Sequence, residues 1–447
     1  MRSHRSRIGV LALSLGLSSL ALACGGDGTT PSGVCSASGT GTLVVNVVGL
    51  PAGVTAKVSV TGPSGTQAVS ASQTFAGAAG GSYSITADKV TQADPIVRTV
   101  YSATISASTV CVSGSATQTV TVTYAPIPTS NKVWLSASNS PTGNTHGFAS
   151  ALLGATGNQE ATVATKSGAG RHLAFDRDGN LWSNGGTTAD PALLRIPAAS
   201  FAASGAVQPD RKIDITGLDC IPGVGGIAFD KDGSLWFGAP CKKVIYKLAA
   251  AQLAASATVT PVLTIPFAMG AEGLAFDKSG NLWVGSGDEG HLARFDAASL
   301  ASAAATPSLV LTASTKASGG SPLHPGWLAF DASGNLWTND FGGNVVFQFP
   351  AAELAGTAPK EVVPPALVTV GVSALLGGMS FDEGGGLWVT FGQGKFARLA
   401  PPQLTVTTDP GNPTLPERVI SSANLGYGED IALYPAPASL PLYSALP

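Results

Sequence analysis

One short segment recurs along this chain at a nearly constant interval, and this recurrence constrains the fold more than any other feature. Five copies carry an aspartate six residues before a tryptophan, and they read HLAFDRDGNLW, GIAFDKDGSLW, GLAFDKSGNLW, WLAFDASGNLW and GMSFDEGGGLW. A sixth, degenerate copy has Tyr434 in the place of the aspartate. The aligned positions 176, 230, 277, 331, 382 and 434 are 54, 47, 54, 51 and 52 residues apart. A period of about fifty residues with several short strands per copy is typical of a β-propeller.

Each copy contains the elements of one propeller blade. In the third copy, apolar residues alternate along a predicted strand, and Asp277 with Gly280 predicts a tight turn into a returning strand. Two more strand-like segments follow, and one four-stranded sheet cannot bury both of its faces alone. Six copies therefore predict six blades, with the strand from Lys132 closing the ring by pairing with the segment that ends at Tyr434. A seventh blade built from residues 139–169 is the alternative.

The region before the repeats has a different pattern. Residues 35–125 contain β-branched segments such as TLVVNVV, TAKVSV and ATQTVTVTY, which predict a small antiparallel β-sandwich. This region resembles the immunoglobulin-like or carboxypeptidase-regulatory-like modules of bacterial surface proteins. Residues 126–131 contain two prolines and are expected to form a linker to a propeller that spans residues 132–447. Only 11% of the residues are charged, and the chain has 56 glycines and 30 prolines, which also favours an all-β chain.

The N-terminus is typical of an exported protein. Residues 1–23 place three arginines before an apolar run that is short for a membrane span, which predicts a signal peptide. The segment LALAC resembles the bacterial lipoprotein box, which implies that Cys24 is lipidated and anchors the chain to a membrane outside the cytoplasm. Residues 24–34 would then be a flexible tether. Ordinary secretion and an uncleaved anchor are the alternatives.

The charge balance argues against one class of partner. Removal of the predicted signal peptide leaves 21 basic residues against 27 acidic ones, a net charge of −6. Such a chain lacks the basic surplus with which proteins bind nucleic acid, so no nucleic-acid partner is expected. We expect a monomer in the cell envelope, periplasmic or on the cell surface, whose partner is an unidentified protein or small molecule.

Four further cysteines bear on the compartment. They are Cys35, Cys111, Cys220 and Cys241, and an even number in an exported chain predicts two disulfides. The first two lie near the ends of the predicted sandwich and would cross-link them. The other two flank one hairpin of the second repeat, so their bridge is expected to staple a blade. Reduced, buried thiols are the alternative.

Candidate binding residues come from the positions just before each repeat. The innermost strands of a propeller start at one rim of the central channel, so residues at these positions converge there. Arg171, Glu272 and Glu429 are five residues before the aligned positions, and His172 and Asp430 follow one step later. Most other copies carry glycine, which is expected to leave space for a small ligand. The alternative is structural, with Arg171 and His172 pairing with Glu429 and Asp430 where the first and last blades meet.

The repeat G-[LI]-A-F-D-x-x-G-N-L-W resembles the NHL-type repeat and the six-bladed group that includes gluconolactonase-like proteins and virginiamycin B lyase. The segment AEGLAF looks like the metal-binding segment of the gluconolactonase group, which implies that Glu272 is a metal ligand. The segment HPGWLAF resembles part of the lyase repeat, which implies that His324 lies at the site. Further oxygen ligands for Ca²⁺ or another divalent cation would come from Asp288, Glu289, Asn339 and Asp340.

Two main functional hypotheses follow. The first is a lipid-anchored envelope protein whose propeller binds a partner or a small ligand without catalysis. The alternative is a metal-dependent lactonase or lyase that acts at the channel mouth through Glu272 and His324. A purely structural surface component is a third hypothesis. The sequence has no H-E-x-x-H, C-x-x-C or G-x-S-x-G motif that would indicate an enzyme class.

Overall fold

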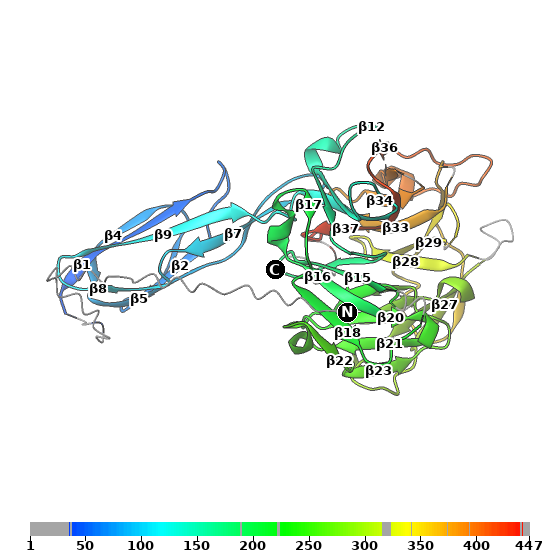
Figure 1. Ribbon diagram of the computed structural model, residues 1–447, viewed down its shortest axis with the longest axis horizontal. Helices are drawn as coiled ribbons and strands as arrows, with labels where there is room; N and C mark the ends of the chain where they lie inside the picture. Colours follow the sequence, from blue (N-terminus) through cyan, green and yellow to red (C-terminus); the bar gives the residue numbers. More distant parts are fainter. Residues whose placement is uncertain are drawn as a thin grey trace, which may run out of the picture.

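The chain is all-β, and Figure 1 shows two groups of sheets. The computed structural model describes residues 35, 38–187, 190–220, 224–314, 323–340, 342–372, 374–392, 394–438 and 440. The predicted signal peptide, the tether and Cys24 lie outside these residues. Within them, no helix is long and apolar enough to cross a membrane. The helical segments are short 3₁₀ turns, namely η1 (Ser150–Leu152), η2 (Ala198–Ala202), η3 (Pro240–Lys242), η4 (Ala250–Leu253), η5 (Gly287–Glu289), η6 (Ala297–Ser299) and η8 (Pro401–Leu404).

Two sheets face each other in the N-terminal region. The first, in spatial order, contains β4 (Gln73–Ala79), β1 (Thr40–Val48), β9 (Thr117–Pro126), β7 (Thr99–Ile105) and β6 (Val90–Gln92). The second contains β3 (Gly65–Val69), β2 (Val58–Gly62), β5 (Gly81–Ala87) and β8 (Thr109–Val112). Residues alternate between buried and partly exposed along β1, as expected for a strand with one face on a core. The shared core includes Leu43, Val58, Ile85 and Val120.

Six further sheets follow, which we call blades 1 to 6 in the order of their innermost strands. Blade 1 contains β14 (Leu173–Phe175), β15 (Leu181–Thr187), β16 (Asp190–Ile196), β18 (Arg211–Ile215) and β22 (Ala257–Val259). Blade 2 contains β19 (Ile227–Phe229), β20 (Leu235–Ala239), β21 (Val244–Leu248) and β23 (Leu263–Pro266). Blade 3 contains β24 (Gly273–Phe276), β25 (Leu282–Gly285), β26 (His291–Phe295), β27 (Leu309–Ala313) and β31 (Lys360–Val362).

The remaining blades follow the same plan. Blade 4 contains β28 (Pro325–Phe330), β29 (Leu336–Asp340), β30 (Val345–Phe349) and β32 (Leu367–Thr369). Blade 5 contains β33 (Leu376–Phe381), β34 (Leu387–Phe391), β35 (Lys395–Leu399), β36 (Arg418–Ser421) and β12 (Gly157–Asn158). Blade 6 contains β37 (Tyr427–Tyr434), β10 (Lys132–Ser138), β11 (Thr145–Ala149), β13 (Val163–Lys166) and β17 (Gly205–Ala206).

The six blades close into a ring, so this part of the chain is a β-propeller. Each innermost strand contacts that of the next blade, and β37 of blade 6 returns to contact β14 of blade 1. Within blade 6, β10 pairs antiparallel with β37, and Lys132 lies opposite Tyr434. This pairing confirms the predicted closure. The alternative of a seventh blade is wrong, because residues 139–169 supply β11 and β13 to blade 6 and β12 to blade 5.

The repeated aspartate holds the turn between the two inner strands of a blade. In blade 3, Asp277 Oδ1 accepts the backbone N–H of Ser279 and Asn281, and Oδ2 accepts the indole N–H of Trp283 at 3.0 Å. Gly280 has a φ of 80°, which favours glycine at this position of the turn. The same aspartate-to-indole bond occurs in five blades. The spacing of six residues in the sequence therefore reflects one hydrogen bond that fixes a buried tryptophan.

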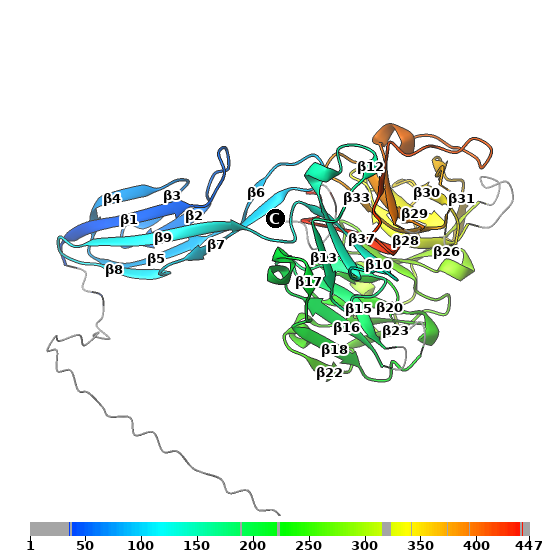
Figure 2. The same cartoon turned by 45° about the horizontal axis from the view of Figure 1, so that its top comes forward.

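The sandwich contacts the propeller at this turn end. Lys89 Nζ lies 2.7 Å from the Asp178 carboxylate in the blade 1 turn, and Arg98 Nε lies 2.5 Å from Glu383 in the blade 5 turn. Ile96 and Val97 are buried in a cluster formed mainly by propeller residues. Figures 1 and 2 show the sandwich extending away from the propeller as an elongated arm. The two parts are therefore joined by side-chain contacts as well as by the chain itself.

Both predicted disulfides are confirmed. Cys35 and Cys111 are bonded with their Cα atoms 5.6 Å apart, and Cys220 and Cys241 are bonded with their Cα atoms 6.0 Å apart. The second bond joins the loop before β19 to η3 after β20, so it closes one end of blade 2. Two disulfides are typical of a protein that folds in an oxidising compartment outside the cytoplasm.

Candidate functional site

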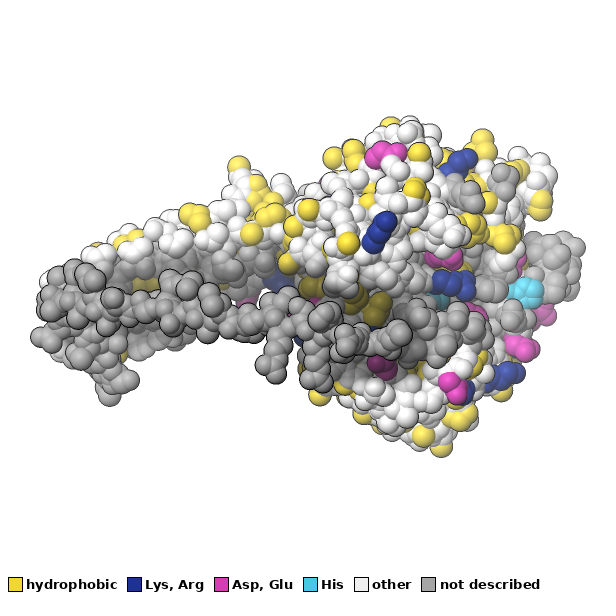
Figure 3. Space-filling model, in the orientation of Figure 1, with side chains coloured by type: hydrophobic (Ala, Val, Ile, Leu, Met, Phe, Trp, Pro, Cys, Tyr) yellow, Lys and Arg dark blue, Asp and Glu magenta, His cyan; other side chains and the backbone are white. Residues whose placement is uncertain are grey.

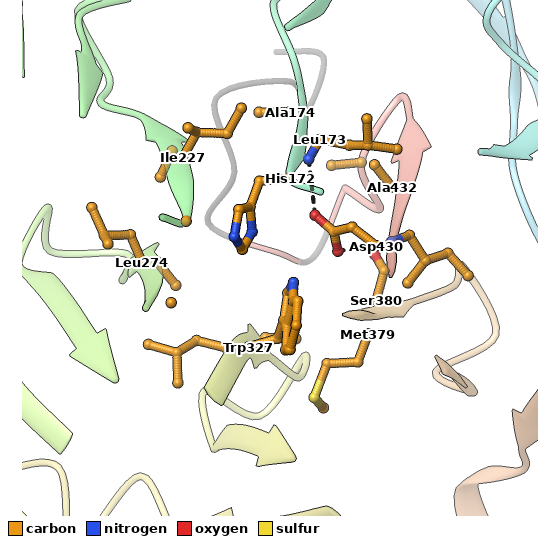
Figure 4. Close-up of a pocket in the computed structure, with 18 of the residues that line it drawn as sticks. His172, Leu173, Ala174, Ile227, Leu274, Trp327, Met379, Ser380, Asp430 and Ala432 are labelled. Atoms are coloured by element: carbon orange, nitrogen blue, oxygen red, sulfur yellow. Dashed lines mark hydrogen bonds between the residues drawn. The ribbon is translucent and has the colours of Figure 1, made fainter. Parts of the chain in front are cut away.

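The innermost strands surround a central cavity of about 140 Å³ (Figure 4). Its wall has four levels, because consecutive residues of each strand line it from the channel mouth, where the strands begin, towards the turn end. At the turn end, Ala436 and Leu440 of the C-terminal segment also line the cavity. The mouth level carries most of the polar groups, contributed by His172, Trp327 and Asp430.

An aromatic pair spans the mouth. The His172 ring from blade 1 and the Trp327 ring from blade 4 have centroids 5.5 Å apart at an interplanar angle of 33°. Blades 1 and 4 lie opposite each other in the ring of six, so this pair crosses the channel, as Figure 4 shows. The Arg171 guanidinium lies 5.7 Å from the centre of the Trp327 ring. A flat apolar surface with a cation beside it is thus available to a ligand.

The Asp430 carboxylate is buried at the same level and is held by the backbone. Its Oδ2 accepts the N–H of Leu173 at 2.8 Å, which is the dashed bond in Figure 4, and its Oδ1 accepts its neighbour Ile431 N–H. Burial raises the pKa of Asp430 to about 7, against the lowering effects of these backbone donors and of Arg171, while Glu429 adds to the rise. The group is therefore balanced between its neutral and charged forms near neutral pH.

The His172 imidazole is neutral under most conditions. Burial lowers the pKa of His172 to about 3, and the positive charge of Arg171 lowers it further in the same direction. The backbone N–H of His172 donates to Asn184 Oδ1 at 2.9 Å. A neutral imidazole stacked on Trp327 presents an aromatic surface and cannot act as a cation near neutral pH.

The predicted seam between the first and last blades is present. Arg171 Nε lies 3.4 Å from the Glu429 carboxylate, which also accepts the Ser138 hydroxyl at 2.8 Å. Asp430 bonds to Leu173 N–H, next to His172, and so also links blade 6 to blade 1. Arg171 therefore pairs with Glu429 as the structural hypothesis predicted, whereas the His172 ring lies beside Trp327 and Asp430 bonds to the backbone of Leu173.

In blade 4, the predicted site residues are used mainly for structure. Asn339 is fully buried, its Oδ1 accepts Trp327 N–H at 2.8 Å, and its Nδ2 donates to the Leu376 carbonyl of blade 5. Asp340 Oδ1 accepts His324 N–H at 2.8 Å, and the His324 Nδ1 lies 3.7 Å from the same oxygen. Burial raises the pKa of Asp340, while His324 lowers it. Asn339 holds the backbone of Trp327 and joins blades 4 and 5. Its effect on the cavity is therefore indirect, through the position of Trp327.

Glu272 immediately precedes β24, and its backbone bridges blade 2 and blade 3. Its carbonyl accepts Gly226 N–H, and its N–H donates to the Gly285 carbonyl. Nothing in the described part of the chain groups three or more His, Cys, Asp or Glu side chains in a way that could hold a metal ion. The side chain of Asp288 lies outside that part. The described residues do not fit the calcium site that the resemblance implied, and we derive no metal-dependent step.

The glycines at the mouth have a second role besides the expected one. A Cβ on Gly378 would lie 1.9 Å from Asp430 Oδ1, and one on Gly273 would lie 2.1 Å from the Gly326 carbonyl. These contacts are too short for any side chain, so glycine is required because neighbouring inner strands approach closely. Gly226 and Gly273 also line the cavity, so close strand approach is a requirement in addition to the expected one. The space lies in the centre of the ring.

Sequence reasoning missed two features of the cavity. Trp327 is aligned with His172 but was not chosen, although a lone aromatic residue among glycines was a readable signal. Ser380 lies in the cavity wall two residues before Asp382, where the other five copies have alanine. Ser140 Oγ also lies 3.1 Å from His146 Nε2. That nitrogen donates to the Gly143 carbonyl, so it cannot accept the serine proton as a catalytic base would.

No protein-family model matches the sequence, and no curated protein matches it. The chain is similar to the solved structure of virginiamycin B lyase from Staphylococcus aureus, with 11% identity and a TM-score of 0.35 over 53% of this chain and 68% of that chain. It is also similar to a protein from Lactobacillus plantarum, with 12% identity and a TM-score of 0.40 over 60% and 78%. A WD40 domain from Toxoplasma gondii coronin gives 13% identity and a TM-score of 0.36 over 67% and 66%. These similarities are too distant to indicate an activity, and the fold assignment rests on the strand topology of this chain.

Proposed function

We propose that this chain is an exported, lipid-anchored β-propeller protein that binds a small ligand in its central channel without changing it chemically. The observation that carries the proposal is the cavity lined by the innermost strands of all six blades, with its polar groups gathered at the mouth. Concave sites with apolar walls and a few convergent polar groups are the usual form of small-ligand sites. The mouth offers a stacking surface on Trp327, a cation on Arg171 and a carboxyl group on Asp430.

The attachment of the sandwich supports an orientation for this site. The sandwich contacts the turn end of blades 1 and 5, and the mouth is at the other end of the same strands. If Cys24 is lipidated, an immunoglobulin-like arm would hold the propeller with its mouth facing away from the membrane. Figure 3 shows basic and acidic side chains scattered among apolar and other residues on the face in view. Replacing Cys24 with serine is expected to release the chain from the membrane fraction.

The binding proposal is tested with the fluorescent probe 8-anilinonaphthalene-1-sulfonate, which combines an aromatic body with an anion. We expect saturable binding of one probe molecule to the mature wild-type chain, and loss of that binding in Trp327→Ala. Leu415→Ala is the matched control, because Leu415 is a large apolar residue that is 72% exposed and does not line the cavity. Equal binding by the wild type and Trp327→Ala, or loss in Leu415→Ala alone, would overturn the proposal.

A further inference from the structure

The third level of the channel wall is a ring of small side chains. It consists of Ala174, Ala228, Ala275, Ala329, Ser380 and Ala432, one from each innermost strand. All but Ala275 are partly exposed, although they lie in the middle of the propeller. Each of these side chains lines the central cavity, so their exposed area faces the channel. The small residues thus leave space at this level that larger side chains would fill.

The levels on both sides of this ring are apolar. The level nearer the mouth has leucine, isoleucine and methionine, such as Leu274 and Met379, and the level nearer the turn end has five phenylalanines and Leu433. A chamber with such walls excludes water well and favours an apolar guest.

Ser380 gives this chamber one polar group. Its hydroxyl is the only one among the cavity-lining residues, and it has no hydrogen-bond partner among the residues that the structure describes. A hydroxyl can both donate and accept, so it matches either a hydroxyl or a carbonyl on a guest. Burying this hydroxyl beneath a purely apolar guest would cost free energy, because its hydrogen bond would be lost.

We infer that the channel takes a small, flat, apolar molecule, such as a substituted aromatic ring, that carries one hydroxyl or carbonyl group. The apolar body lies against the alanine ring, and the polar group bonds to the Ser380 hydroxyl. This inference rests on the proposed function, because it names the class of ligand that the channel binds. A ligand that enters from the mouth would pass Trp327, which is half-buried and whose ring lies beside that of His172.

The test compares phenol with toluene, which differ chiefly by the hydroxyl group, on the full mature chain by calorimetric titration. Ser380→Ala gives blade 5 the residue that the other five blades have at this level. We expect phenol to bind the wild type more tightly than toluene. Ser380→Ala should weaken phenol binding by about fivefold to tenfold, the usual value of one hydrogen bond, and leave toluene binding unchanged.

A second variant tests the chamber itself. Ala329→Leu fills the ring and is expected to abolish binding of both compounds, and its melting temperature shows whether it is folded. The inference would be overturned if Ser380→Ala lost phenol and toluene binding equally, or if phenol bound both variants as tightly as the wild type. If one of these results is obtained but Trp327→Ala still abolishes binding of the anilinonaphthalene probe, the proposed function stands. If no compound binds in the channel, both fail.

Discussion

The two ends of the propeller are held together in different ways. At the turn end, five blades use the same bond from a carboxylate to a tryptophan indole. At the mouth, the devices differ between blades. Blade 2 has the Cys220–Cys241 disulfide, blades 1 and 4 have the amides of Asn184 and Asn339, and the closure has the bond from Asp430 to Leu173.

This difference separates architecture from function. Five blades make the same turn and fix a tryptophan in the same geometry, so the residues for that task repeat in them. The mouth is common to all blades, but each strand meets a different part of one asymmetric space, so its residues are free to differ. The positions at which the copies disagree, such as His172, Trp327, Ser380 and Asp430, are those that line the cavity.

The largest expected effect concerns the turn end of blade 5. Asp382 is 2% exposed, it accepts the Trp388 indole at 2.9 Å, and it accepts Arg398 Nε at 2.6 Å. Asp382→Ala leaves a buried guanidinium without its main partner, so the free energy of unfolding should fall by about 3–5 kcal/mol in urea titrations. The matched variant Asp331→Ala removes the same indole bond without a buried cation and should cost about 1–3 kcal/mol. Equal losses would contradict the role assigned to Arg398.

The structure of the turn end could be predicted from the sequence, but most of the arrangement at the channel mouth could not. The period, the six blades and the closure by Lys132–Ser138 follow from a burial pattern and from local hydrogen bonds that five of the six copies share. Asp430 and His172 could be predicted as candidates because the innermost strands of a propeller begin at the same rim of the channel. The need for glycine between neighbouring strands could not be predicted, because close approach depends on backbone positions that a single copy does not reveal. Ser380 was overlooked because its contrast with alanine is visible only across all six copies.

The second prediction concerns the mouth of blade 2. The Cys220–Cys241 disulfide closes a segment with a sequence separation of 21 residues. Replacing both cysteines with serine should lower the free energy of unfolding by about 3 kcal/mol, because the unfolded chain regains the freedom that the closed loop removes. Hydrogen exchange should quicken near η3 and remain slow at the Asp230 turn, because its indole bond is intact. Equal acceleration at both ends would show that blade 2 opens as one unit.

The third prediction uses the two buried titrating groups of the mouth, whose effects on stability have opposite signs. Asp430 keeps its proton up to about pH 7 when folded, so its contribution is present at low pH and is lost as the pH rises through about 7. His172 has a pKa of about 3 when folded, so its contribution is present above its ordinary pKa and is lost as the pH falls towards 3. Between about pH 4 and 6.5 the two slopes oppose each other.

Single variants should reveal each slope. In His172→Gln, the free energy of unfolding should fall more steeply with rising pH than in the wild type, by up to about 1.4 kcal/mol per pH unit. In Asp430→Asn it should instead rise with pH over the same range. Urea titrations at a series of pH values measure both, and the double variant controls for all other groups. Unchanged slopes in both single variants would contradict the pKa shifts on which this prediction rests.

The smallest effect concerns the Arg171–Glu429 pair, and it tests whether the seam also tunes the site. Arg171 has a 43% exposed side chain, so its loss should cost less than about 1 kcal/mol of stability. The two residues act on Asp430 in opposite directions, because Arg171 lowers its pKa and Glu429 raises it. Arg171→Gln should therefore move the Asp430 titration to higher pH, and Glu429→Gln should move it to lower pH, as measured by carboxyl-carbon NMR. If both variants lose the same small amount of stability and the Asp430 titration does not move, the pair only joins the two blades. The pKa of Asp430 would then depend on burial and not on this pair.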